Sequence, residues 1–251
     1  MNLLYVPIFI WGLLFGSFLN VIIYRLPRNL SIVFPNSFCP KCKKPIPLYR
    51  NIPLFSFIIQ LGKCAECKNK ISFRYPLIEL FNGILWYLNF QQFDLQTAIF
   101  SSIISSCILA IIVIDFENFI IPINIILFGL IILGLEIGLN PVLWTKSFYG
   151  MLIGVGYLGI VFLITSLLMK KQAMGYGDLI LIGLLGIWLG PIKVLYTIFI
   201  GALLGLIFYF IMNHHSNKQI KKLPFGTFLG FSSFINHFID LSNFTKYIIQ
   251  N

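Results

Sequence analysis

Residues 3–24 form a run of 22 positions without a charged side chain. About 20 such residues are needed for an α-helix to cross the hydrocarbon core of a bilayer. No basic residue precedes the run and no small-residue cleavage site closes it, so we expect a retained membrane anchor rather than a signal peptide. Over all 251 residues, 58% are hydrophobic and 10% are charged, whereas a soluble domain has about 25% charged residues. The chain is therefore predicted to be an integral membrane protein.

Further apolar runs predict an all-α, polytopic fold. The runs at 179–192 and 225–240 are shorter than the others, so we predict about eight transmembrane helices, with seven as the alternative. The predicted helices that follow 3–24 lie at 76–93, 95–114, 119–139, 147–169, 179–192, 194–212 and 225–240.

The distribution of lysine and arginine supports eight helices with the N-terminus outside. Cytoplasmic loops collect these residues, and the inner segments of this arrangement hold 15 of the 18. The arrangement places Asp115 and Asp178 on the cytoplasmic side. The net charge of +10 then fixes the topology and meets the anionic headgroups of the lipid bilayer, so we expect no nucleic-acid partner. The inner segments are 25–75, 115–118, 170–178 and 213–224.

The segment 25–75 carries two C-x-x-C pairs, "CPKC" and "CAEC", which are separated by 21 residues. Two such pairs resemble a zinc ribbon, in which four thiolates close a tetrahedral site and the ion is structural. The alternatives are two disulfides or four free thiols, and a reducing cytosol disfavours the disulfides. We predict structural Zn²⁺ bound by Cys39, Cys42, Cys64 and Cys67.

This reading divides the chain into three parts. A first transmembrane helix is expected at 1–24 and a cytoplasmic zinc-binding loop at 25–75, between the first and second transmembrane helices. A membrane core of about seven helices is expected at 76–251. The loop has too little apolar material to fold alone, so the metal would supply folding energy.

Two aspartates stand at the inner ends of apolar runs. Asp115 follows the run 95–114, and Asp178 opens a run after Gly175 and Gly177, which permit close backbone approach and positive φ. Taken singly, Asp178 is explained as a residue that caps a helix, and Asp115 as a charge that marks the end of a transmembrane helix. Acids at membrane depth are nevertheless costly and commonly functional. Two adjacent carboxylates share a proton, so one can activate water while the other protonates a leaving amine.

The pair therefore predicts an aspartic protease at the membrane surface. A polytopic cation-coupled transporter remains open on the residues alone, because proton relays also use membrane aspartates. The cysteine-rich loop and the lack of paired repeats argue against it. Serine and metal proteolysis have no support, since the sequence contains neither G-x-S-x-G nor H-E-x-x-H.

Five motifs, in order along nearly the whole chain, resemble those of the type IV prepilin peptidases. These are the bifunctional leader peptidases and N-methyltransferases of the GxGD aspartic membrane proteases. The motifs are "GSFLNVIIYRLPR" (16–28), the cysteine loop with "SFRYPLIELFNG" (72–83), "IDFENFIIP" (114–122), "GYGD" (175–178) and "LPFGTFLG" (223–230).

The resemblance implies an intramembrane aspartic endopeptidase with Asp115 and Asp178 as its catalytic residues, in a peptidase core at 76–251. It would remove the basic leader of type IV prepilins or pseudopilins after a glycine, at the cytoplasmic face of the bacterial inner membrane. It would then methylate the new N-terminus with S-adenosyl-L-methionine, for a type IV pilus, a type II secretion system or a DNA-uptake pilus. A non-catalytic pilus assembly factor is a further alternative.

Other acids are expected to support this site. The segment 25–75 holds ten basic residues and one acid, so a basic leader is expected to avoid it. The one acid of the loop, Glu66, together with Glu79, Glu117 and the aspartate pair, is predicted to attract the leader. Two positions depart from the family pattern, because Ile180 stands where a lysine is frequent and Ile123 follows the proline of the first aspartate motif.

Overall fold

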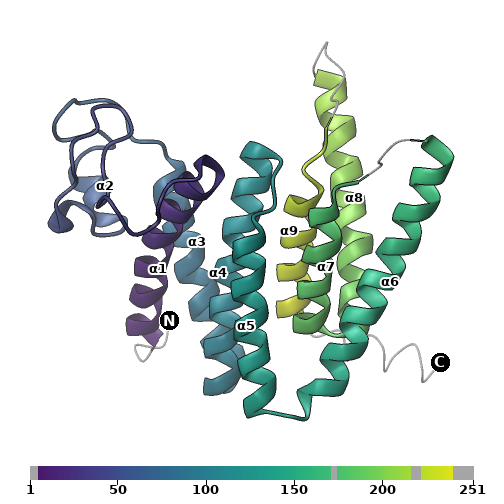
Figure 1. Cartoon of the computed structure of the whole chain (residues 1–251). Helices are drawn as coiled ribbons and strands as arrows, with labels where there is room; N and C mark the ends of the chain where they lie inside the picture. The colour runs from purple at the N-terminus through teal and green to yellow at the C-terminus, as the bar shows by residue number, and fades with distance from the viewer. Residues whose placement is uncertain (1–4, 171–173, 216–221, 240–251) are drawn as a thin grey trace. The chain divides into compact units, whose positions relative to one another are not determined.

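The computed structural model describes residues 5–170, 174–215 and 222–239. In these residues the chain is helical and contains no β-strand, which confirms the predicted all-α class. Figure 1 shows the helices in chain order. They are α1 (Val6–Arg25), η2 (Leu26–Arg28), η3 (Leu48–Arg50), α2 (Phe55–Ile59), α3 (Arg74–Gln92), α4 (Leu95–Asn118), α5 (Ile123–Leu139), α6 (Leu143–Met169), α7 (Tyr176–Leu189), α8 (Pro191–His215) and α9 (Phe225–Phe238).

Each predicted apolar run coincides with one helix, α1 or one of α3 to α9. Within the described residues, four helices are long and apolar enough to cross a membrane, namely α1, α4, α6 and α8. Helix α7 has 14 residues, and at 1.5 Å per residue it is about 21 Å long. That is shorter than the hydrocarbon core of about 30 Å. The total of eight crossings stays a prediction.

The chain forms two compact units, Met1–Ala110 and Ile111–Asn251. We call them unit 1 and unit 2 and describe each by itself. Unit 1 contains the cysteine loop with the helices before and after it. Unit 2 contains the end of α4 and the helices α5 to α9. The proposed division into 1–24, 25–75 and 76–251 stays a prediction.

Close packing of α1 on α3 organises unit 1. A Cβ atom on Gly12 would lie 2.8 Å from the Cα of Gly83, and one on Gly16 would lie 2.7 Å from the Cα of Glu79. Small residues let helix backbones approach in lipid, where no hydrophobic force drives helices together. Asn82 adds a buried hydrogen bond between the helices, from its Nδ2 to the Gly12 carbonyl at 2.7 Å.

Helix α7 is the buried centre of unit 2. It contacts α5, α6, α8 and α9, and its residues Leu181, Ile182, Leu184 and Leu185 are fully buried. On one side, Gly150 of α6 and Gly186 of α7 are in backbone contact. The Ser147 hydroxyl of α6 also donates to the Ile187 carbonyl at 3.0 Å. These contacts hold the short helix, and the aspartate at its start, between its neighbouring helices.

Candidate active site and metal centre

Asp115 lies inside helix α4. The sequence placed it just beyond the end of a span, but α4 continues through Asn118. The helix ends at Phe119, whose φ of 56° is left-handed and whose N–H donates to the Asp115 carbonyl at 2.8 Å. The Asp115 side chain is 5% exposed. It is therefore a buried carboxyl group with a fixed direction, and not a solvated end of the helix.

Two hydrogen bonds from Thr227 hold the Asp115 carboxylate. The Thr227 N–H donates to Asp115 Oδ2 at 2.7 Å, and its hydroxyl lies 3.0 Å from the same oxygen. The hydroxyl also lies 3.1 Å from the Ile112 carbonyl on α4. A hydroxyl carries one proton, so it donates to one of these two acceptors at a time. Thr227 thus fixes the position of the carboxyl group. Its hydroxyl can donate to Asp115 when the carboxyl group is ionised and to the Ile112 carbonyl when it is protonated.

Asp178 occupies the first turn of α7. Gly175 is the N-cap, with a φ of −73° and a ψ of 143°, and Asp178 stands three residues later. The backbone N–H groups of Gly175 and Gly226 interact with the Asp178 carboxylate. In the first of these contacts, the Asp178 side chain accepts from the N-cap residue of its own helix, as in a capping box. The capping role expected for Asp178 is therefore present, and the contact with Gly226 adds a second connection that reaches α9.

The N-terminus of α9 brings the two aspartates together. Pro224 is its N-cap, so Gly226 and Thr227 lie in the first turn, where backbone N–H groups have no partner within the helix. The N–H of Gly226 faces Asp178 and that of Thr227 faces Asp115. Consecutive residues of a helix are 1.5 Å apart along its axis, and the positive end of the helix dipole favours anions. Residues that are 63 positions apart in the chain thus share one anion-binding helix end.

The side chain of Ile121 lies against two glycines next to the aspartate pair, Gly177 and Gly226. A Cβ atom on Gly177 would lie 3.1 Å from the Ile121 Cβ, and one on Gly226 would lie 2.7 Å from the Ile121 Cδ1 and 3.1 Å from Asp115 Oδ2. Glycine at 177 thus allows the close approach of Ile121. The positive φ expected for the "GYGD" glycines is absent at Gly175, where φ is negative.

The sequence did not predict a role for Gly226, Thr227 or Ile121. All three lie within the motifs "LPFGTFLG" and "IDFENFIIP". None of them carries a charge, so a search for titratable residues passes over them. The Thr227 contact spans 112 positions, and only a folded chain shows it.

The two predicted supporting acids lie in different units. Glu117 is exposed in the last turn of α4 in unit 2, two residues after Asp115. Glu79 is 8% exposed in α3 of unit 1, where its Oε2 accepts the Leu54 N–H at 2.9 Å. The role of each as an attractor of the leader stays a prediction.

The four loop cysteines converge in unit 1. Their sulfur atoms all lie within 4.8 Å of one another, and the Sγ atoms of Cys39 and Cys67 are 3.9 Å apart. Four sulfurs bound at 2.3 Å around one tetrahedral ion would be about 3.8 Å apart. Each of these cysteines is free of disulfides, so the predicted alternative of two disulfides is wrong for this structure. The cluster has the donor set and the spacing to hold a metal ion.

The two C-x-x-C turns are built alike. Cys39 N–H donates to the Lys44 carbonyl at 3.0 Å, and Cys64 N–H donates to the Asn69 carbonyl at 2.8 Å. The residue after the second cysteine of each pair has a left-handed φ, 61° at Lys43 and 58° at Lys68. Each turn thereby presents two sulfurs on the same side. The likeness of the two turns follows from the repeated motif.

Charged and polar neighbours tie the two turns together. Glu66, inside the second pair, accepts from Lys44 at 2.9 Å and from Arg50 at 3.3 Å. The hydrogen bond and the charge of Lys44, and then Arg50, lower the pKa of Glu66. The backbone and the side chain of Asn69 donate to Cys67 and lower the pKa of that thiol to about 6. The thiolate is the form of cysteine that binds a metal.

Two family models match the segments that contain the cysteines and the aspartates. Residues 10–93, which include the four cysteines, match the Bacterial Peptidase A24 N-terminal domain. Residues 102–210, which include both aspartates, match the Type IV leader peptidase family. No solved structure gives a significant match.

Curated relatives match over most of their length. The prepilin leader peptidase/N-methyltransferase of Neisseria gonorrhoeae is 34% identical over 250 residues, with 89% of this chain and 87% of the relative covered. The protein of the same name from Pseudomonas aeruginosa is 33% identical over 259 residues, with 89% and 86% covered. A type 4 prepilin-like proteins leader peptide-processing enzyme of Escherichia coli is 30% identical, with 87% and 88% covered. The chain therefore belongs to the type IV leader peptidase family.

Proposed function

We propose that this protein cleaves the leader from type IV prepilins or pseudopilins after a glycine, and then methylates the new N-terminus. Its site would face the cytoplasm at the bacterial inner membrane. The observation that carries the proposal is the end of α9, where consecutive N–H groups face Asp178 and Asp115. The names of the relatives support the substrate and the second activity.

The two carboxyl groups divide the proton transfers of hydrolysis. One carboxylate takes a proton from water while the water oxygen bonds to the scissile carbonyl carbon. The other carboxyl group protonates the leaving nitrogen as the carbon–nitrogen bond breaks. Because the pair shares one proton and titrates as a unit, the two roles belong to the pair. The N–H groups of α9 stabilise whichever member is ionised.

The leader would reach this pair along the acidic end of α4. Glu117 is exposed two residues beyond Asp115. The loop holds ten basic residues and one acid, and that acid, Glu66, is already paired with Lys44 and Arg50. A positively charged leader is therefore drawn to Glu117 and away from the loop.

The experiment that tests the proposal measures the mass of a processed substrate. The detergent-purified protein is incubated with a prepilin and S-adenosyl-L-methionine, and the N-terminus of the product is measured by mass spectrometry. The proposal predicts loss of the leader after a glycine and one added methyl group. An intact prepilin, or proton-coupled transport by vesicles without cleavage, would contradict it.

We propose structural Zn²⁺ at Cys39, Cys42, Cys64 and Cys67. Since four thiolates leave no open position on the ion, its contribution is the folding of the loop rather than the reaction.

We expect about one zinc ion per chain, and loss of this ion in a Cys64→Ser variant. The loop should then be cut by protease at 29–73, because its two turns are no longer joined. Zinc content by mass spectrometry and limited proteolysis measure the two effects. Cys107→Ser, which changes a buried α4 cysteine outside the cluster, is the control and should keep its zinc. An unchanged zinc content in Cys64→Ser would refute the site.

Thr227→Val is expected to lower kcat about tenfold, because it removes one hydrogen bond to a charged group and keeps the backbone N–H. Thr227→Ser keeps the hydroxyl and should restore most of the rate. Steady-state cleavage of a prepilin should show the loss in kcat with KM nearly unchanged, since Thr227 positions Asp115 and does not touch the leader. Equal rates for Val and Ser would show that the hydroxyl has no such role.

S-adenosyl-L-methionine is proposed as the methyl donor. When bound, it supplies a methyl group to the lone pair of the new amine, the sulfur keeps the electrons of the broken carbon–sulfur bond, and the amine releases a proton.

A further inference from the structure

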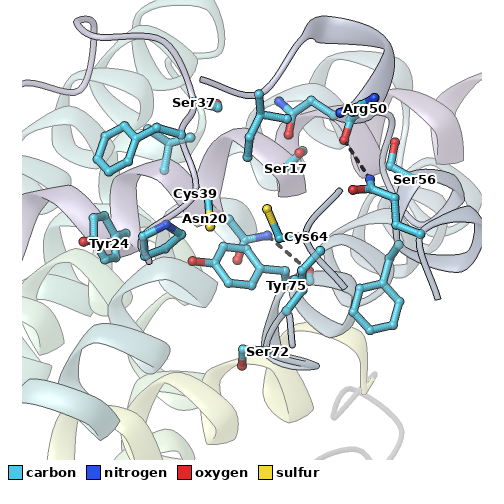
Figure 2. A pocket seen from close by; sticks show the side chains of 18 of the residues that line it. Ser17, Asn20, Tyr24, Ser37, Cys39, Arg50, Ser56, Cys64, Ser72 and Tyr75 are labelled. Atoms are coloured by element: carbon cyan, nitrogen blue, oxygen red, sulfur yellow. Dashed lines mark hydrogen bonds between the residues drawn. The ribbon is translucent and has the colours of Figure 1, made fainter. Parts of the chain in front are cut away.

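Unit 1 encloses a cavity of about 470 Å³ between α1, the cysteine loop and the start of α3 (Figure 2). Small-molecule sites have volumes of about 300 to 1,000 Å³ and mostly apolar walls with a few placed polar groups. The cavity has this character. Its walls include the rings of Tyr24, Phe38, Phe57 and Tyr75 and the polar side chains of Asn20 and Ser56.

Two buried polar atoms in this wall have no hydrogen-bond partner. Asn20 is 4% exposed, and its Nδ2 donates to the carbonyls of Tyr75 at 3.1 Å and Gly16 at 3.3 Å. Its Oδ1 is left without a donor, and so is the hydroxyl of Ser56, which is 8% exposed. Buried polar groups are nearly always satisfied, and leaving one unpaired costs about 1–3 kcal/mol. A ligand in the cavity that donates hydrogen bonds would supply the missing partners of these two lining residues.

A buried acid lies in the same wall. Glu79 interacts with the Leu54 N–H and with Ser17, and it lines the cavity together with both of them. A carboxylate inside a protein is favoured by a cation at short range. The lining also includes the basic residues Arg28, Arg50 and Lys70, so a ligand with a positive and a negative group finds both an acid and bases there.

We propose that this cavity binds the methyl donor. The donor is an adenosine with a sulfonium cation and an amino acid group, so it offers a flat ring, N–H donors, a positive centre and a carboxylate. The aromatic rings suit the adenine, Asn20 and Ser56 accept its N–H groups, and Glu79 faces its positive charge. The proposal rests on the proposed function and assigns methylation to unit 1, whereas the aspartate pair belongs to unit 2.

Direct binding tests this assignment without reference to activity. S-adenosylhomocysteine, the product that lacks the sulfonium charge, and S-adenosyl-L-methionine are titrated by calorimetry into the full-length protein in detergent. We expect Ser56→Ala to weaken both ligands about 3- to 10-fold. Glu79→Gln should weaken binding of the sulfonium ligand about 10-fold or more, and should weaken binding of the thioether product less.

The matched control is Ser102→Ala. Ser102 is fully buried in α4 of unit 1, its hydroxyl also lacks a partner, and it does not line the cavity. Its affinity for both ligands should equal that of the wild type. Leader removal by Ser56→Ala should also persist, while the product carries less methyl, because the aspartate pair is unchanged.

A measurement on the wild type covers the case in which a variant misfolds. The donor is cross-linked by ultraviolet light, and the labelled peptides are mapped by mass spectrometry. Label within 16–79 supports the assignment, and label confined to 111–239 overturns it. Unchanged affinity in both variants, with normal binding by the wild type, also overturns it but leaves the proposed function intact. A wild type that cleaves prepilin and binds neither ligand instead removes the methylation part of the proposed function, and with it this site.

Discussion

Replacing Asp178 or Asp115 by asparagine is expected to lower the rate of leader cleavage by at least about 10³-fold, the loss found when an essential acid–base residue is removed. Asparagine keeps the shape of the side chain and one oxygen for the N–H groups of Gly226 and Thr227. It cannot exchange a proton with water or with the leaving amine. Single-turnover cleavage of a prepilin, followed by mass spectrometry, measures the loss.

A control aspartate lies at the other end of α4. Asp94 accepts the Thr97 N–H at 3.2 Å at the start of the helix, and asparagine serves equally well at such a cap. Asp94→Asn should therefore cleave at the wild-type rate. Activity within tenfold of the wild type in Asp178→Asn would show that this carboxyl group is not part of the reaction.

Gly150→Ala is expected to have the largest effect on stability. A Cβ atom at this position would overlap the Gly186 carbonyl and would lie 2.8 Å from the Gly190 Cα. Both contacts are with backbone, so the helices α6 and α7 would have to separate. Overpacking of a well-packed core costs about 1–3 kcal/mol and sometimes more, and we expect the upper end of this range. Because α7 carries Asp178, cleavage should fall as well.

The control is Gly156→Ala in the same helix, where nothing lies within 4 Å of an added Cβ atom. Alanine is a better helix former than glycine by about 1 kcal/mol, so this variant should be as stable as the wild type or slightly more so. Thermal unfolding of the two variants in one detergent, followed by tryptophan fluorescence, gives the comparison. Equal unfolding temperatures would mean that α6 and α7 are not packed through Gly150.

The apolar runs predicted which segments are helical, because uncharged stretches of this length have few other solutions in a membrane. They did not predict where the helices end. Asp115, Glu117 and Asn118 are polar but remain helical in α4, and the next helix starts only at Ile123, after its N-cap Pro122. Proline disfavours a helical residue before it, so this second boundary had a signal in the sequence. The polarity of a residue alone does not predict where α4 ends.

The cysteines and the aspartates could be found from the sequence because their chemistry is carried by the residue type. Their surroundings could not. Thr227 and Gly226 act through backbone N–H groups, which every residue except proline possesses, so residue type carries no information about them. The unsatisfied oxygens of Asn20 and Ser56 likewise become visible only when every other hydrogen bond of the folded chain is known.

The central claim is that Asp115 and Asp178 work as one unit, and the double variant Asp115→Asn/Asp178→Asn tests it most directly. Single-turnover cleavage rates are compared for the wild type, the two single variants and the double variant. Because removal of either member disables a shared proton relay, the double variant should cleave within about threefold of the slower single variant. The claim is contradicted if either single variant stays within tenfold of the wild type, or if the double variant falls by the product of the two single losses.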